Sequence, residues 1–165
     1  MKQRTTAERK SDRELVITRT FNAPARIVFA AWTKPELMKR WWVPKSAPIS
    51  LVSLDADVRV DGKYRLVFAI GDDGKQTMAC FGKYIEVSPP SRLVWTNEEG
   101  DGGVSISTLT LEEKGGKTLL TLHELHPSKE ALDAAMTSGV LEGTTVQHDQ
   151  LDEFLVTLVA SGGQS

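Results

Sequence analysis

The segment from Ile49 to Leu125 is the most informative part of the chain, because it repeats one pattern several times. Short stretches rich in β-branched, aromatic and leucine residues are separated by turn-forming pieces such as Gly115-Gly116. This pattern predicts five or six sequential antiparallel strands in a meander. The stretches read ISLVSLDADVRV, KYRLVFAI, TMACFGKYIEV, RLVWT, VSISTLTL and TLLTLHEL.

One amphipathic helix is expected after these strands, from Thr144 to Val159. Leu151, Leu155 and Leu158 fall on one helical face, and Asp152 and Glu153 fall on the other. A sheet of about six strands must cover its apolar face, and this helix is the only large apolar element available. We therefore expect an α+β domain in which a curved antiparallel sheet wraps around a long C-terminal helix.

The residues before the meander predict a first strand over Glu14–Phe21, because apolar and polar side chains alternate there. Two short helices should follow, the first opened by Pro24. Residues 1–13 are polar and charged, which favours a disordered tail. The predicted organisation is therefore a tail over residues 1–13 and a single domain over residues 14–161.

Composition excludes several classes of protein. The chain has 165 residues and a net charge of −2, so no global positive field favours a nucleic-acid partner. Its single cysteine, Cys80, cannot form an intrachain disulfide, which fits a reduced cytoplasm. Since no apolar run approaches the length of a bilayer span, we predict a cytoplasmic protein with no membrane partner.

Several short motifs resemble those of one known family. Their order and spacing resemble the START-like (SRPBCC) superfamily, and within it the heat-shock-protein ATPase activator homologue (AHSA-type) group, over roughly residues 14 to 160. The motifs are R-x-F-x-A-P at Arg19–Pro24, A-W-T-x-P-E at Ala31–Glu36, Trp41-Trp42, D-G-K-Y at Asp61–Tyr64, G-x-Y-x-E-V at Gly82–Val87 and P-x-x-L-V-W-T at Pro90–Thr96.

This resemblance implies the helix-grip fold, with a cavity between sheet and helix that takes a small hydrophobic or amphipathic ligand. It requires no cofactor and no metal, and it suggests a role in stress. Strand and helix periodicity adds candidate wall residues: Trp42, Phe68, Met78, Trp95, His123, His148, Leu151 and Leu155. Packing as solid core is the alternative for each. The faces of Met78 and Cys80 cannot be assigned from the pattern alone.

Two other functions stay open. The first is a cochaperone-like module that binds a chaperone or another protein, although the segment before Glu14 is too short for the chaperone-binding domain of the eukaryotic activators. The second is a cyclase or hydrolase that uses His123 or His148 in the cavity. We assign no catalytic residue, and we expect a monomer or a homodimer. Zinc binding by His123, His126 and His148 is disfavoured because H-x-x-H on a strand points the two rings to opposite faces.

Overall fold

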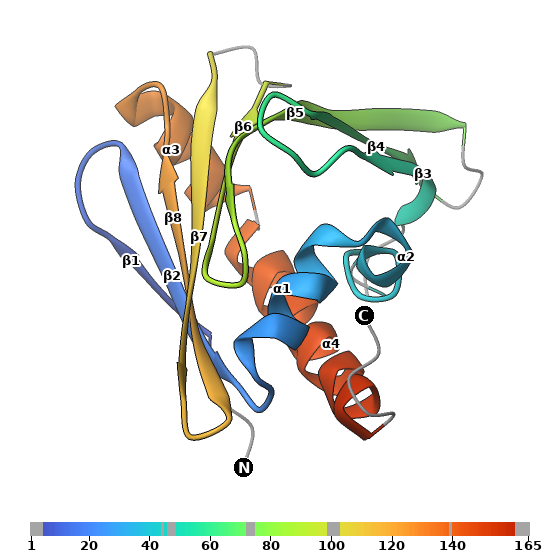
Figure 1. Cartoon of the computed structure of the whole chain (residues 1–165). Coiled ribbons are helices and arrows are strands. Elements are labelled where there is room, and N and C mark those ends of the chain that lie inside the picture. The colour runs from blue at the N-terminus through green and yellow to red at the C-terminus, as the bar shows by residue number, and fades with distance from the viewer. Residues whose placement is uncertain are drawn as a thin grey trace.

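The computed structural model describes residues 5–43, 45, 49–71, 75–98, 103–138 and 140–160, without the side chain of residue 140. Within these ranges the chain forms eight strands and four helices (Figure 1). The strands are β1 (Thr6–Arg9), β2 (Glu14–Phe21), β3 (Ile49–Ala56), β4 (Lys63–Ile70), β5 (Gln76–Ser88), β6 (Arg92–Asn97), β7 (Ser105–Lys114) and β8 (Lys117–Leu125). The helices are α1 (Ala25–Thr33), α2 (Pro35–Met38), α3 (Lys129–Thr137) and α4 (Val140–Ala160).

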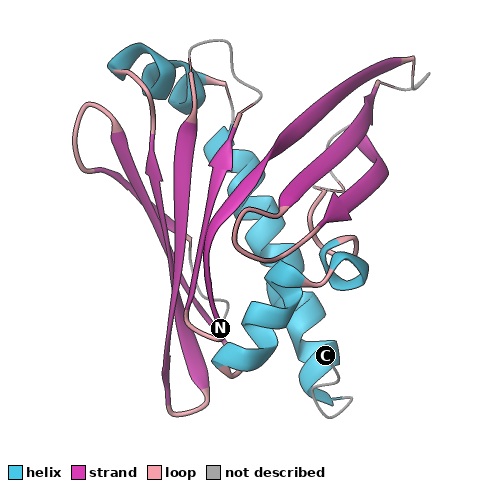
Figure 2. Ribbon diagram, turned by 45° about the horizontal axis from the view of Figure 1, so that its top comes forward, coloured by secondary structure: helices cyan, strands magenta, loops and turns pink. Residues whose placement is uncertain are grey.

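All the strands belong to one antiparallel sheet with the order β1-β2-β8-β7-β6-β5-β4-β3. The sheet bends strongly, and Figure 2 shows α4 lying between its two limbs. One limb contains β1, β2, β8, β7 and β6, and the other contains β3 and β4 with the first part of β5. This arrangement confirms the predicted α+β helix-grip fold, the meander from β3 to β8 and the two short helices after the first predicted strand.

Strand β5 joins the two limbs because it changes partners along its length. Its first part pairs with β4 as far as Lys63↔Lys83, and its last part pairs with β6 from Tyr84↔Trp95 onward. The register shifts between Tyr84 and Glu86, which is the signature of a bulge, and bulges bend strands. The sheet therefore bends at Tyr84, where β5 leaves β4 and joins β6.

Gly82 lets strand β6 pass close to this bend. A Cβ atom placed on Gly82 would lie 2.0 Å from the carbonyl oxygen of Thr96, which is far inside contact distance. Only glycine allows the two backbones to approach so closely. The glycine of the G-x-Y-x-E-V motif thus has a packing role two residues before Tyr84.

The core fills the space between the sheet and the helices. The inward side chains of β2 alternate strictly along the strand, and Arg19 is the one charged residue among them, at 2% exposure. Leu151 and Leu155 of α4 are fully buried against this core, as predicted from helical spacing. No helix in the described ranges combines the length and the apolar character needed to cross a membrane.

Two boundaries differ from the sequence prediction. The prediction of a disordered tail over residues 1–13 is wrong for Thr6–Arg9, which form edge strand β1 in register with Leu15–Thr18 of β2. Residues 1–4, and residue 161 at the predicted end of the domain, lie outside the described residues. Helix α4 begins at Val140, one turn before the expected start at Thr144.

Candidate functional site

The four tryptophans of the chain gather where α1 and α2 meet the bend of the sheet. The Trp32 ring lies 4.9 Å from Trp41, 5.5 Å from Trp42 and 5.8 Å from Trp95, measured between ring centroids. Trp41 is fully buried, and its indole N–H donates to the carbonyl oxygen of Ala31 at 3.0 Å. Trp42 is only partly buried, so the two adjacent tryptophans have different surroundings.

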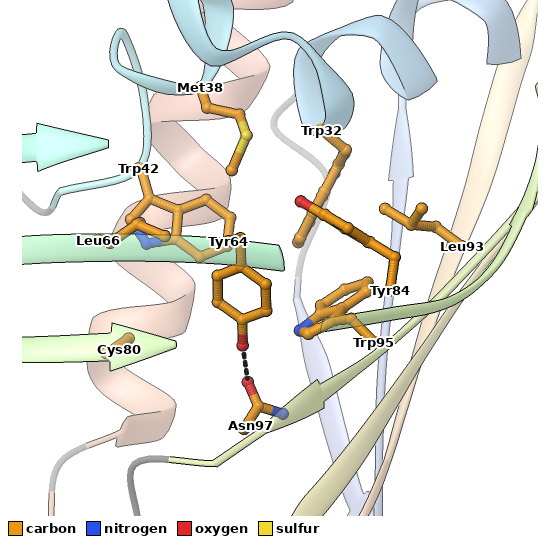
Figure 3. Close-up of a pocket in the computed structure, with 10 residues that line it drawn as sticks. All are labelled: Trp32, Met38, Trp42, Tyr64, Leu66, Cys80, Tyr84, Leu93, Trp95 and Asn97. Atoms are coloured by element: carbon orange, nitrogen blue, oxygen red, sulfur yellow. Dashed lines mark hydrogen bonds between the residues drawn. The ribbon is translucent and has the colours of Figure 1, made fainter. Parts of the chain in front are cut away.

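A hollow of about 100 Å³ opens beside this cluster (Figure 3). Strand register supplies part of its wall, since Leu66 pairs with Cys80 and Tyr64 pairs with Gly82, two residues before Tyr84. Aromatic and aliphatic side chains make most of the remaining surface. The lining residues are Trp32, Met38, Trp42, Tyr64, Leu66, Cys80, Tyr84, Leu93, Trp95 and Asn97.

The polar groups at one end of the hollow are bonded to each other and to the sheet. The Tyr64 hydroxyl donates to the carbonyl oxygen of Thr96 at 2.6 Å and lies 3.1 Å from Asn97 Oδ1, the contact drawn in Figure 3. The amide nitrogen of Asn97 donates to Ser107 Oγ at 2.9 Å. This end of the hollow is therefore held by internal hydrogen bonds.

The Tyr84 hydroxyl is in a different situation. The residue is 4% exposed, and no side-chain hydrogen bond to it is found among the described residues. Burial raises the pKa of Tyr84 to about 12, so the hydroxyl keeps its proton at neutral pH. The buried indole nitrogen of Trp32 also has no hydrogen-bond partner in the part of the chain that the structure describes.

A second hollow, of about 160 Å³, also has Trp42 in its wall. Phe68 and Met78 are paired across β4 and β5 and contribute to its wall. Gln147 of α4 donates from its amide nitrogen to the Trp42 carbonyl oxygen at 2.6 Å, which ties this helix to the segment after α2. The lining residues are Trp42, Val43, Ile49, Phe68, Met78 and Gln147.

The structure brings four of the predicted wall residues to these hollows. Trp42 lines both, Trp95 lines the first, and Phe68 and Met78 line the second. Met78 and Cys80 lie on the strand face that lines the hollows, which resolves the ambiguity left by strand alternation, and Met78 is 45% exposed there. Ligand binding by these residues stays a prediction.

The other four predicted residues do not line either hollow. Leu151 and Leu155 are core residues, and His148 faces β2 at a different part of α4. The placement of His123 in the cavity is wrong, because it lies on the opposite face of β8 from buried Leu122. There its Nε2 is 2.9 Å from Glu14 Oε1, and this contact holds the pKa of Glu14 below its usual range.

Sequence reasoning did not select several residues of the two walls. Strand alternation could have identified Tyr84, because it shares a strand face with Cys80. The helix residues could not be found this way, because they meet the sheet only through the tertiary fold. The residues not selected are Trp32, Met38, Tyr84, Asn97, Val43, Ile49 and Gln147.

His148 belongs to a buried polar cluster between α4 and β2. Its Nδ1 is 3.2 Å from Thr5 Oγ1, and its ring packs edge-on against Phe21 at 5.8 Å. Burial, followed by repulsion from the Arg19 guanidinium, lowers the pKa of His148 to about 4. Among the described residues, no three His, Cys, Asp or Glu side chains are grouped to hold a metal ion.

Comparison with known proteins gives the family. Residues 22–156 match the family described as Activator of Hsp90 ATPase homolog 1-like protein. The chain belongs to this family, which confirms the resemblance to the START-like, AHSA-type group. A comparison with curated proteins gave no match.

Solved structures with the same fold come from several bacteria. A protein of Rhodobacter sphaeroides has a TM-score of 0.84 and 25% identity, covering 93% of this chain and 99% of that one. A protein of Mycobacterium smegmatis has a TM-score of 0.77 and 27% identity, covering 93% and 98%. A protein of Nitrosomonas europaea has a TM-score of 0.80 and 25% identity, covering 92% and 99%.

Proposed function

We propose that this protein binds a small hydrophobic or amphipathic molecule between the bent sheet and the helices. The observation that carries the proposal is the pair of hollows of about 100 and about 160 Å³ that share Trp42 as a common wall. Both are lined mainly by aromatic and aliphatic side chains. Binding sites for small molecules have this character, with an apolar surface and a few polar groups that orient the ligand.

The apolar walls support an occupant. Both hollows are partly open, so water reaches them when no ligand is bound. Water against an apolar wall is less favourable than an apolar ligand there. Water in such a site needs two to four polar partners, and the second hollow offers mainly the Gln147 side chain.

The placement of the histidines favours binding over catalysis in these hollows. The enzyme alternative requires an ionisable residue such as His123 or His148 facing the ligand. His123 is on the outer face of β8, and His148 packs against Phe21 on β2. The ten residues that line the first hollow include no histidine.

The test is a ligand screen with a variant that fills the first hollow. Native mass spectrometry of the purified protein, followed by thermal-shift measurements with apolar and amphipathic compounds, should identify molecules that raise the melting temperature, since a ligand selective for the folded state stabilises it. Cys80→Leu places a larger side chain into the first hollow and should abolish the shift for molecules bound there.

Ala79→Leu is the matched control, because it adds the same side chain on the other face of β5. It should keep the response to the same compounds. A protein that copurifies with nothing and responds to no compound contradicts the proposed function. Equal loss of response in the two variants contradicts the location.

A further inference from the structure

The Tyr84 hydroxyl is the group in the first hollow whose hydrogen-bonding capacity is left open. Figure 3 shows the Tyr84 ring extending from β5 into the space beside Trp32 and Trp42. The ring projects inward because Tyr84 lies on the same face of β5 as Cys80, at the point where β5 changes partners from β4 to β6. Unlike the indole nitrogen of Trp32, the side-chain oxygen of Tyr84 is not fully inaccessible, so a ligand atom can replace water as its hydrogen-bond partner in the hollow.

Trp32, which lines the same hollow, carries a second polar group without a partner among the described residues, although its nitrogen is inaccessible to solvent. The Trp32 indole N–H cannot accept a hydrogen bond, and it has no acceptor among the described residues. At the opposite end, Tyr64 and Asn97 are engaged with Thr96 and Ser107. The Tyr84 hydroxyl can donate or accept, but a phenol is a stronger donor than acceptor, so an acceptor on the ligand is its favoured partner.

The charge of the ligand follows from the same walls. None of the ten described residues that line the hollow is an acid, a lysine, an arginine or a histidine. A charged ligand would lose its hydration without a counter-ion to replace it. Aromatic faces attract cations, so a cationic ligand is the competing case. A neutral ligand fits these surroundings.

We propose that the first hollow binds a neutral ring-sized molecule that carries one hydrogen-bond acceptor, such as an aryl ketone, and that the Tyr84 hydroxyl donates to that acceptor. This inference rests on the proposed function and specifies its ligand class. An engineered apolar cavity of ~150 Å³ accommodates benzene. The first hollow, at about 100 Å³, is smaller than that cavity but is partly open and shares Trp42 with the second hollow of about 160 Å³, so one ring with a short substituent would extend past Trp42.

The experiment compares acetophenone with ethylbenzene, which have the same ring and similar shape but differ in the carbonyl acceptor. Dissociation constants for both probes are measured with wild-type protein and with Tyr84→Phe, by following the indole N–H signals of the four tryptophans in NMR titrations. Tyr84→Phe changes the dissociation constant of each probe by some factor. The ratio of these two factors isolates the interaction between the hydroxyl and the carbonyl, because the hydration of the free probes cancels. We expect Tyr84→Phe to weaken acetophenone about fivefold more than it weakens ethylbenzene.

Tyr64→Phe is the matched control, since it removes the other tyrosine hydroxyl, which is already bonded to Thr96. Tyr64→Phe should change the dissociation constants of acetophenone and ethylbenzene by the same factor. NMR spectra of both variants verify the fold. If both probes bind but Tyr84→Phe affects them equally, or if tetramethylammonium binds more tightly than acetophenone, the inference is overturned while the proposed function stands. If neither probe moves any indole signal, the inference is overturned, and the proposed function falls as well only if the wider compound screen also gives no response.

Discussion

The guanidinium of Arg19 lies beneath α4, where its Nη1 is 2.7 Å from Asp149 Oδ1. A second contact joins its Nη2 to Asp152 Oδ2 at 3.1 Å. The Arg19 side chain is fully buried, whereas the two carboxylates are partly exposed. The arginine of the R-x-F-x-A-P motif therefore fastens the terminal helix to β2, on the side of α4 away from the hollows.

Replacing Arg19 should loosen this attachment. Arg19→Met keeps an apolar stem but leaves two carboxylates without their partner, so we expect the free energy of unfolding to fall by about 2 to 3 kcal/mol. Urea unfolding measures the loss. In a background with Asp149→Asn and Asp152→Asn, the same substitution should cost at least about 1 kcal/mol less. An identical cost in both backgrounds would show that the ion pairs contribute nothing.

His148 should make stability depend on pH. Its pKa is about 4 in the folded protein and 6.5 when unperturbed, so the unfolded chain takes up a proton first as the pH falls. Its contribution is complete above pH ~6.5 and is lost progressively as the pH falls toward ~4. Between pH 7 and 5 this loss amounts to about 2 kcal/mol, since one pKa unit is 1.36 kcal/mol.

The variant His148→Gln tests this linkage. It removes the titrating group, so its stability should fall by about 2 kcal/mol less than that of the wild type between pH 7 and 5. Urea denaturation at both pH values gives the comparison. Parallel stability curves for the two proteins would refute the assignment to His148.

Two glycines should respond oppositely to alanine. Gly82→Ala forces a Cβ against the Thr96 carbonyl, so β5 and β6 must separate, at a cost of about 3 kcal/mol or more. Gly143→Ala in α4 meets nothing within 4 Å and should stabilise the protein by about 0.5 to 1 kcal/mol. Melting curves of both variants provide the check. A neutral Gly82→Ala would mean that the bend tolerates a wider strand spacing.

Most of the fold could be predicted from the sequence, because strand alternation and helical periodicity are local signals. The inward residues of β2 and the buried leucines of α4 follow directly from them. Strand β1 could not be predicted this way, since its TAER sequence has no apolar face and it adds to β2 at the edge of the sheet. Edge pairing of this kind depends on backbone hydrogen bonds.

The candidate site was less predictable, because it depends on how distant elements meet. Alternation placed Phe68 and Trp95 on walls, but Trp32 reaches the first hollow only because α1 packs over the bend. His123 was misplaced because an error of one residue in strand parity moves a side chain to the other face. The change of partners in β5, which positions Tyr84, arises from a bulge that the residue pattern does not reveal.

The two tyrosines of the hollow should differ in their effect on stability when no ligand is added. Tyr64→Phe removes a donor bonded to the Thr96 carbonyl at 2.6 Å and should cost about 1 to 2 kcal/mol. Tyr84→Phe removes a hydroxyl without a protein partner, so it should change stability by less than about 0.5 kcal/mol or increase it. Urea unfolding of ligand-free protein distinguishes the two. If Tyr84→Phe costs as much as Tyr64→Phe, the Tyr84 hydroxyl already has a partner and is not available to an acceptor on a ligand.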